Sequence, residues 1–334
     1  MAIRTDAQWL AVNLYYGEPW EGFLIKAVKP YIDVVLTTGV ANRFYFERSW
    51  EKGPHIRLWF KGNAFILAKM LRPNLDEHFL QYFESRPSYV KKPLYTDNFP
   101  DDLKWRPNNS IHYPSANPGD TLFGGQAEAN LFEKQYQASS LLVLDSIKEK
   151  ASAWTYNEMI STAIKIHLGF VYAIGFSLEE AASYFDYITE KWFANSYPNS
   201  PSGRDKVLQS FTTISNLQRK DTVPYHSALW QIFKNYEGIN DPLFVDWINT
   251  NADISLQLNL ALAHNKLRPK RKSQQQGNTE VPPAWDYYET LIKLTNNRLG
   301  IFNKNEGFLF FTMAQSLQSI LHSDAWHTNS RMRV

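Results

Sequence analysis

The chain contains no cysteine among its 334 residues. That absence excludes disulfide bonds, metal sites built on thiolates and cysteine nucleophiles. No apolar run approaches the roughly 20 residues needed to cross a bilayer, and the first ten residues lack the apolar stretch of a secretory signal. We therefore expect a cytoplasmic protein with no membrane span.

Net charge and the familiar catalytic signatures are lacking as well. The formal charge is only +2, which gives no global argument for nucleic-acid binding. The sequence has no phosphate-binding glycine loop, no G-x-S-x-G elbow and no H-E-x-x-H pair. Its eight histidines are scattered, and one such as His167, inside an apolar helical run, is typical of a hydrogen-bonded core residue. We expect neither a metal nor a cofactor.

Aromatic residues, in contrast, are plentiful. Trp, Tyr and Phe make up 15% of the chain, within a hydrophobic content of 44% that is ordinary for a globular protein. Aromatic side chains are common where a protein grips a peptide or a partner, and they are also often buried. An aromatic-rich core is the simpler of these two interpretations.

The first part of the chain mixes strand and helix signals. Residues 9–16 are aromatic and β-branched enough for a strand, and apolar residues recur at helical spacing over residues 19–36. Two alternating runs within residues 43–60, joined by a short Gly-Pro loop, predict a hairpin. Alternation places Arg48 on the same face as Phe44 and Phe46.

Past the hairpin, the pattern predicts two short helices and a long irregular segment. Asn63 can cap a helix to about Leu71, with Pro73 ending it, and a second helix is expected over 75–84. Residues 86–121 are rich in Pro, Asn, Asp and Ser, which favours loops with one or two short strands. So long an irregular segment often borders a functional site.

From residue 126 onward the pattern is helical. Thr155 with Glu158, and Ser177 with Glu180, have the spacing of capping boxes. The expected helices cover residues 126–149, 156–174, 178–194, 204–218, 226–235, 242–264, 284–298 and 306–321. The basic, Gln-rich segment 266–283 is expected to be a mobile loop.

These signals together predict an α+β fold. An N-terminal antiparallel sheet with flanking helices, over residues 1–125, is followed by a mainly α-helical region over 126–334. We expect the two parts to form one compact unit.

Cationic side chains concentrate on the predicted hairpin, where Arg43, Arg48 and Arg57 accompany His55. Arg48 shares the face of two phenylalanines and needs a counter-charge, because an unpaired buried charge is costly. One interpretation is a salt bridge to Glu47, Glu51 or a later acid. The other is an anion site, since the guanidinium fork suits a carboxylate.

Three stretches resemble one known family, the C-terminal domains of lantibiotic dehydratases, which also occur alone in thiopeptide and other bacteriocin clusters. The hairpin FYFERSWEKGPHIRLWF (44–60) is similar to the family's aromatic-x-R-Y-x-D-x-G-P-H-x-R-x-R-F block. LFGGQAEANLFEKQYQASS (122–140) resembles its R-Y-G-G turn and following helix, and YETLIKLTNNRLGI (288–301) resembles its S-x-I-H-M-x-x-N-R-L-x-G helix.

The resemblance implies a reaction on a precursor peptide. In full-length members one domain attaches glutamate from glutamyl-tRNA to Ser and Thr, and the C-terminal domain eliminates it to leave dehydroamino acids. This chain resembles the second domain alone, which implies a separate glutamylating partner. It implies catalytic roles for Arg48 and Lys293, and substrate binding by His55, Arg57 and Arg298, with Asn297 also matching.

The sequence departs from the family pattern at four positions. Lys293 replaces a histidine assigned to proton transfer, and a lysine with its ordinary pKa near 10.4 is protonated at neutral pH. Leu122 and Phe123 replace the Arg and Tyr of the R-Y-G-G turn, and Trp59 replaces the last arginine of the hairpin block. Two alternatives to elimination therefore stay open: a non-catalytic subunit that binds the peptide or stabilises a partner, and a cycloaddition enzyme that forms a pyridine.

Overall fold

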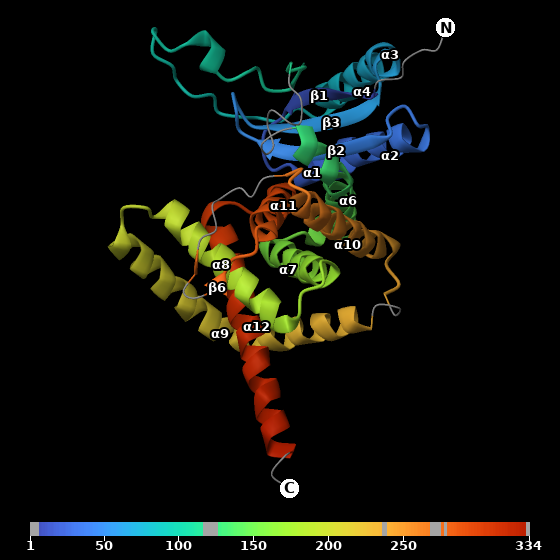
Figure 1. The fold of residues 1–334 in the computed structure, drawn as a ribbon. Helices are drawn as coiled ribbons and strands as arrows, with labels where there is room; N and C mark the ends of the chain where they lie inside the picture. The colour runs from blue at the N-terminus through green and yellow to red at the C-terminus, as the bar shows by residue number, and fades with distance from the viewer. Residues whose placement is uncertain (1–6, 116–125, 236–238, 268–274, 277–278, 332–334) are drawn as a thin grey trace. The chain divides into compact units, whose positions relative to one another are not determined.

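The computed structural model describes residues 7–115, 126–235, 239–267, 275–276 and 279–331. Its contacts divide the chain into two units, Met1–Trp154 and Thr155–Val334. The first unit holds a four-stranded sheet with helices, and the described part of the second is mostly helical (Figure 1). The α+β fold class is confirmed.

The sheet of the first unit has the strand order β2-β3-β1-β4. Each strand is antiparallel to its neighbours, and the predicted strand and hairpin are confirmed. The four strands are β1 (Ala7–Tyr15), β2 (Arg43–Ser49), β3 (His55–Asn63) and β4 (Ser110–His112).

Both faces of this sheet are covered. On one face Phe60 of β3 lies beside Phe44 of β2 and contacts Tyr31. On the other face Tyr45 stacks on Trp59, with ring centroids 5.6 Å apart, and contacts Tyr136 of α6 (Gln126–Lys150). The predicted aromatic core is therefore present here, and charged residues of the hairpin lie within it.

Two helical segments follow β1 and β3, and each changes to a π-helical turn in its middle. The first consists of α1 (Glu21–Phe23), η1 (Leu24–Val28) and α2 (Lys29–Thr37). The second consists of α3 (Ala64–Ile66), η2 (Leu67–Leu71) and α4 (Arg72–Ser85).

The prediction that Pro73 ends a helix is wrong. Asn63 caps the segment as expected, accepting hydrogen bonds from Phe65 N and Ile66 N, but the helix continues past the proline to Ser85. A proline ring ordinarily clashes with the carbonyl one turn earlier. The wider π turn, closed by the bond from Arg72 N–H to the Leu67 carbonyl, comes directly before Pro73 and accommodates the ring.

The irregular segment after α4 is confirmed over the described residues 86–115. Its regular elements there are the 3₁₀ turn η3 (Asp101–Leu103) and β4. Ser88 anchors it through hydrogen bonds with Asn108 and Asn109, and Asn109 N–H donates to the Tyr15 carbonyl at 2.7 Å. The segment is thereby tied to the end of β1.

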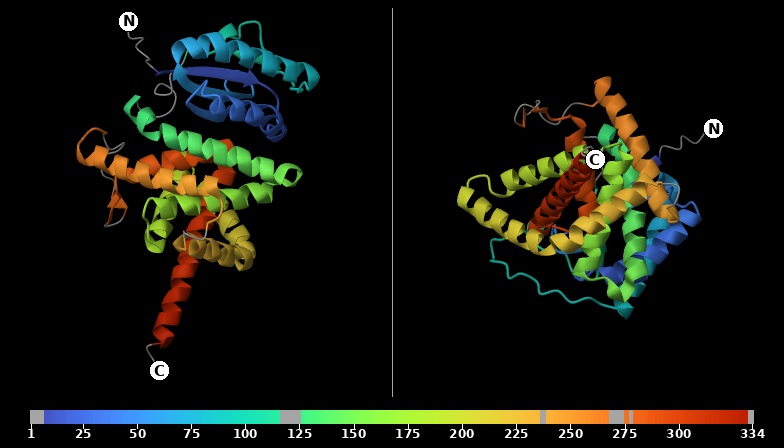
Figure 2. Two further views of the ribbon diagram at one scale, coloured as in Figure 1. Left: turned by 90° about the vertical axis from the view of Figure 1, so that its right-hand side faces the viewer. Right: turned by 90° about the horizontal axis from the view of Figure 1, so that it is seen from below.

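The second unit contains long helices. They are α7 (Tyr156–Ala173), α8 (Leu178–Ser196), α9 (Pro201–Lys234), α10 (Pro242–Ala263), α11 (Ala284–Leu299) and α12 (Asn303–Arg331). In the views of Figures 1 and 2, α12 lies against α8 and α9, and α10 packs on α7. Thr155 caps α7 and Ser177 forms a complete capping box with Glu180, as predicted.

The helices expected over 204–218 and 226–235 are one helix in the structure. Pro224 lies inside α9 without ending it. Both halves carry buried residues, Phe211 before the proline and Trp230 after it, and α9 packs on both α12 and α7. Packing along the whole length compensates for the hydrogen bond that the proline removes. In the predicted loop 266–283, the described residues include the short strands β5 (Gln275–Gln276) and β6 (Thr279–Glu280).

The close approach of α12 to α8 yields a testable prediction. A Cβ added at Gly307 would lie 2.5 Å from the ring of Trp192. Gly307→Ala should therefore lower the free energy of unfolding by about 1–3 kcal/mol, because overpacking moves the helices apart. Chemical denaturation measures the change.

Gly22→Ala is the matched control. Gly22 is exposed in α1, and no atom lies within 4 Å of an added Cβ. Removal of its freedom in the unfolded chain should stabilise the protein by about 0.5 kcal/mol. Equal effects at the two glycines would contradict the packing explanation.

Candidate functional site

Arg48 lies near the end of β2 and is buried with a counter-charge. Register pairs it with Ile56 of β3, on the face of Phe44 and Phe46, as alternation predicted. Its Nη1 donates to Glu21 Oε1 at 2.8 Å, and its guanidinium lies 5.8 Å from the ring centroid of Trp20. A salt bridge is therefore present, but its acid is Glu21 of α1, which precedes Arg48 in the chain, whereas one interpretation predicted Glu47, Glu51 or a later acid.

Arg57 on β3 extends from the opposite face of the sheet. Its Nε donates to Asn13 Oδ1 at 2.9 Å, and its Nη2 donates to Glu51 Oε2 at 3.1 Å. Asn13 is buried, whereas the side chain of Glu51 is 64% exposed. Asn13 therefore holds the guanidinium in place, and the bond to Glu51 is exchangeable with solvent.

His55 is fully buried at the start of β3. Its Nδ1 lies 2.9 Å from the Gly53 carbonyl, and its ring packs on Tyr15. Burial lowers the pKa of His55 to about 4, so the ring is neutral at pH 7 and its Nδ1–H donates to the carbonyl. This bond closes the turn between the two hairpin strands.

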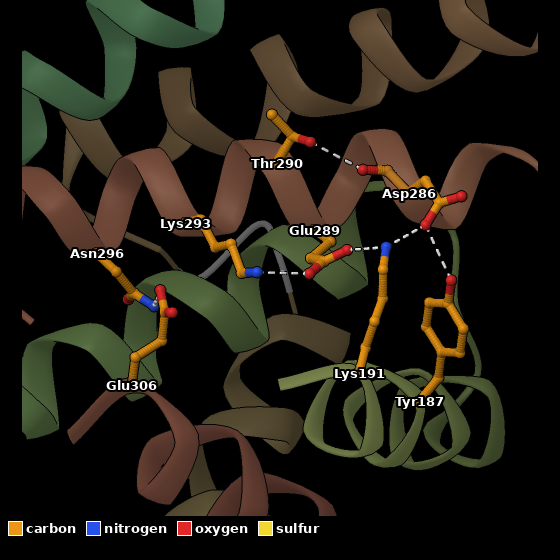
Figure 3. Close-up of polar contacts among 8 residues, drawn as sticks. All are labelled: Tyr187, Lys191, Asp286, Glu289, Thr290, Lys293, Asn296 and Glu306. Carbon is orange, nitrogen blue, oxygen red and sulfur yellow. Dashed lines mark hydrogen bonds and ion pairs between the residues drawn. The ribbon is translucent and has the colours of Figure 1, made fainter. Parts of the chain in front are cut away.

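Lys293 belongs to a line of alternating charges along α11 (Figure 3). Its Nζ lies 2.7 Å from Glu289 Oε1, and the other oxygen of Glu289 binds Lys191 of α8. Lys191 also binds Asp286, which accepts a hydrogen bond from Tyr187 at 2.9 Å. The Lys293 side chain is 35% exposed, whereas that of Glu289 is 6% exposed. Lys293 is thus the part of this line that solvent reaches.

A second set of contacts begins one turn further along α11. Asn296 is fully buried, and its Nδ2 donates to Glu306 Oε1 of α12 at 3.1 Å. Its Oδ1 lies 2.7 Å from Nε2 of His167 on α7. His167 is the hydrogen-bonded core residue that was predicted, and burial lowers its pKa to about 4.

Burial also raises the pKa of the Glu306 carboxyl. The hydrogen bond from Asn296 and the charge of Lys293 act in the opposite direction, and the charge of Glu289 adds to the rise. Glu306 therefore holds a proton more readily than an exposed glutamate does. A carboxyl of this kind suits proton transfer.

Arg298 is fully buried in the last turn of α11, which ends at Gly300 in the left-handed conformation. Arg48, His55 and Arg57 belong to the first unit, whereas Lys293 and Arg298 belong to the second. Contact of a single substrate with both sets stays a prediction. Leu122 and Phe123 lie outside the described residues.

The sequence pattern of the family described as "Lantibiotic biosynthesis dehydratase C-term" matches residues 9–317. The chain belongs to this family. The suspected resemblance is confirmed, and membership places the protein in the biosynthesis of ribosomally made, modified peptides. No curated protein matches the sequence.

The solved structures that share the fold include the following three. "Pyridine synthase, TbtD, from thiomuracin biosynthesis" has a TM-score of 0.72 and 16% identity, covering 94% of this chain and 98% of that one. The tRNA-dependent lantibiotic dehydratase MibB from Microbispora sp. 107891 has a TM-score of 0.60 and 16% identity, covering 97% of this chain but 29% of that one. TsrL has a TM-score of 0.59 and 14% identity, covering 94% and 95%.

Two features are absent from the described residues. They contain no group of three or more His, Cys, Asp or Glu side chains arranged to hold a metal ion. Nor do they include a helix long and apolar enough to cross a membrane.

Sequence reasoning found Lys293 but missed the residues around it. The spacing of Glu289 and Lys293, four positions apart on a predicted helix, was a sufficient signal for their ion pair. Lys191, Asn296 and Glu306 come from three different helices, and no local pattern connects them. Trp59, which interrupts the family's hairpin motif, is a buried core residue stacked on Tyr45.

The buried histidines lead to a prediction of how the free energy of unfolding depends on pH. The pKa is lowered to about 4 in each of His55, His167 and His226. Below the ordinary pKa of 6.5 the unfolded chain binds protons that the folded chain does not. The free energy of unfolding should therefore fall between pH 6.5 and 4, by about 3 kcal/mol for each histidine.

Urea denaturation at a series of pH values measures this dependence. His226→Gln should remove about a third of the fall, because His226 is fully buried. The exposed His264→Gln serves as the control and should leave the fall intact. Stability that stays constant down to pH 4 would show that these rings are not buried as neutral groups.

Proposed function

We propose that this protein acts on a precursor peptide and eliminates glutamate from glutamylated Ser and Thr residues, leaving dehydroamino acids. Its family membership over residues 9–317 supports a role in peptide maturation. The fold shared with MibB, which covers 29% of that chain, supports the activity of one part of a dehydratase. The observation that carries the proposal is the polar cluster of Figure 3. In it the partly exposed Lys293 and the half-buried carboxyl of Glu306 lie near each other.

Elimination needs groups of both kinds. A base removes the Cα proton, a cation stabilises the enolate-like charge that develops, and a carboxylate leaves from Cβ. Lys293 supplies a cation whose side chain is partly exposed, and Glu306 supplies a carboxyl suited to proton transfer. Arg48 is the second candidate cation.

The ion pair of Arg48 is compatible with binding a substrate carboxylate. Its partner Glu21 has a side chain that is 29% exposed, whereas that of Arg48 is 5% exposed. Loss of Glu21 alone would leave the guanidinium buried and unpaired, whereas exchange for another carboxylate keeps it paired. A glutamate on the substrate could therefore replace Glu21, with the guanidinium already oriented.

The proposal includes partners. By the family resemblance, a glutamylating protein would deliver the modified peptide to this one. His55 and Arg57 hold the hairpin next to Arg48 in its conformation. They would therefore contribute to peptide binding indirectly, by positioning the hairpin. Arg298 is assigned to substrate binding on the family resemblance.

A second candidate reaction is pyridine formation by cycloaddition. The observation that favours it is the fold shared with TbtD, which extends over 98% of that chain. The substrate would then be a peptide that already contains dehydroalanines. Pyridine formation expels no glutamate, so it needs no free cation to bind one. Arg48, Arg57 and Lys293 each already have a carboxylate partner, which agrees with this reaction.

Two substrates distinguish these reactions. The protein is incubated with a glutamylated precursor peptide and, separately, with one that contains dehydroalanines, and mass spectrometry follows both. Loss of glutamic acid from the first supports elimination, whereas conversion of only the second supports cycloaddition. Tight binding without conversion of either would overturn both and leave a peptide-binding subunit.

Arg48→Met tests the anion site. We expect the elimination rate to fall at least about 100-fold, because a preorganised cation is lost at the developing charge. Arg43→Met is the matched control, since Arg43 begins the same strand and its Nε lies 3.9 Å from Glu133. An Arg48→Met rate within threefold of the Arg43→Met rate would make Arg48 a structural residue.

A further inference from the structure

Glu306 is held in one orientation by a chain of hydrogen bonds that begins in the core. His167 is fully buried, and its lowered pKa of about 4 keeps the ring neutral. The ring therefore donates its Nε2–H to Asn296 Oδ1, at 2.7 Å. This bond fixes the side-chain amide, so that its Nδ2 points to Glu306 Oε1 at 3.1 Å, as Figure 3 shows.

The second carboxyl oxygen is available. Among the described residues Glu306 Oε2 has no hydrogen-bond partner, and it does not belong to the atoms sealed from solvent. Glu306 also lies in the first turn of α12, whose next residue, Gly307, packs on Trp192. One oxygen is thus anchored while the other can reach a substrate.

The charges that face Glu306 come from several helices. Lys293 and Glu289 on α11 act on its charge directly. Lys191 on α8 is bound to Asp286 and Glu289, and α7 contributes the neutral His167 through Asn296. Lys293 is the cation that balances Glu306.

We propose that Glu306 is the base that takes the Cα proton from the glutamylated residue, with Asn296 as its positioning residue and Lys293 as the cation beside it. The proposal rests on the proposed elimination. The Cα–H bond breaks and its proton passes to Glu306 Oε2, while the electron pair forms the Cα=Cβ bond. The Cβ–O bond breaks, and glutamate leaves as a carboxylate that Lys293 attracts. Water then removes the proton from Glu306.

Burial strengthens Glu306 as a base. A carboxylate whose pKa is raised binds a proton more strongly, and general-base catalysis is most effective when that pKa approaches the working pH. The bond from Asn296 and the charge of Lys293 limit the rise, because both favour the ionised form that accepts a proton. Removal of either partner should therefore raise the pKa further.

Glu306→Gln is the direct test. Glutamine keeps the shape and the acceptor for Asn296 but cannot take a proton, so kcat on the glutamylated peptide should fall about 100-fold or more, with KM little changed. Asp205→Asn, an exposed acid on α9, is the control and should keep full activity. Thermal unfolding of both variants checks that they fold. A Glu306→Gln enzyme with at least a third of the normal kcat would overturn the proposal.

The pH profile tests the positioning role. Asn296→Ala and Lys293→Met should each move the acidic limb of kcat/KM to higher pH, because each removes a group that lowers the pKa of Glu306. Glu289→Gln should move it to lower pH. Lys304→Met, an exposed lysine on α12, should not move it. If the acidic limbs of these kcat/KM profiles do not move in these directions, Glu306 is not the base.

Failure of the proposed function gives a different result. If the unmodified protein releases no glutamate, elimination itself is wrong. If it releases glutamate and Glu306→Gln does so equally fast, only the assignment of the base is wrong.

Discussion

Charged groups inside an aromatic-rich fold are tolerable only with partners, and the described ion pairs follow that constraint. Arg48 has Glu21, Arg57 has Asn13 and Glu51, and Lys293 has Glu289. Breaking a buried pair by removing one partner costs several kcal/mol, because the other charge stays buried. A substrate carboxylate can therefore replace a protein carboxylate at little cost only in an ion pair of which one member is exposed to solvent. We therefore expect the solvent-exposed members of each charged cluster, and not its buried members, to meet the substrate.

Much of the fold could be predicted because its signals are local. Alternation placed Arg48 with Phe44 and Phe46, and capping residues marked the starts of α7 and α8. The predictions of helix boundaries that were wrong also have physical reasons. Pro73 was predicted to end a helix, yet a π turn accommodates it. Residues 204–218 and 226–235 were predicted as two helices, yet packing on both sides of Pro224 keeps α9 continuous. A local change of helix type therefore overrode the proline rule at Pro73, and tertiary packing overrode it at Pro224.

The candidate site was predicted less completely. Family motifs identified Lys293 and Arg48, because motif residues are read along the chain. The hydrogen bonds that link His167, Asn296 and Glu306 span 129 residues between the first two. Such a set depends on how three helices pack, so composition and periodicity carry no trace of it. His167 was correctly interpreted as a core residue, but its bond to Asn296 also gives it an indirect role in orienting the carboxyl.

Gly307 connects the packing of the second unit to its chemistry. It directly follows Glu306, and the ring of Trp192 occupies the space where a side chain would extend. Glycine in a helix interior weakens the helix, so a larger residue would be favoured by propensity alone. Engineering that fills this position for thermal robustness would rotate or shift the first turn of α12. The Glu306 carboxyl would then lose its alignment, so the packing on Trp192 and the orientation of this carboxyl depend on the same glycine.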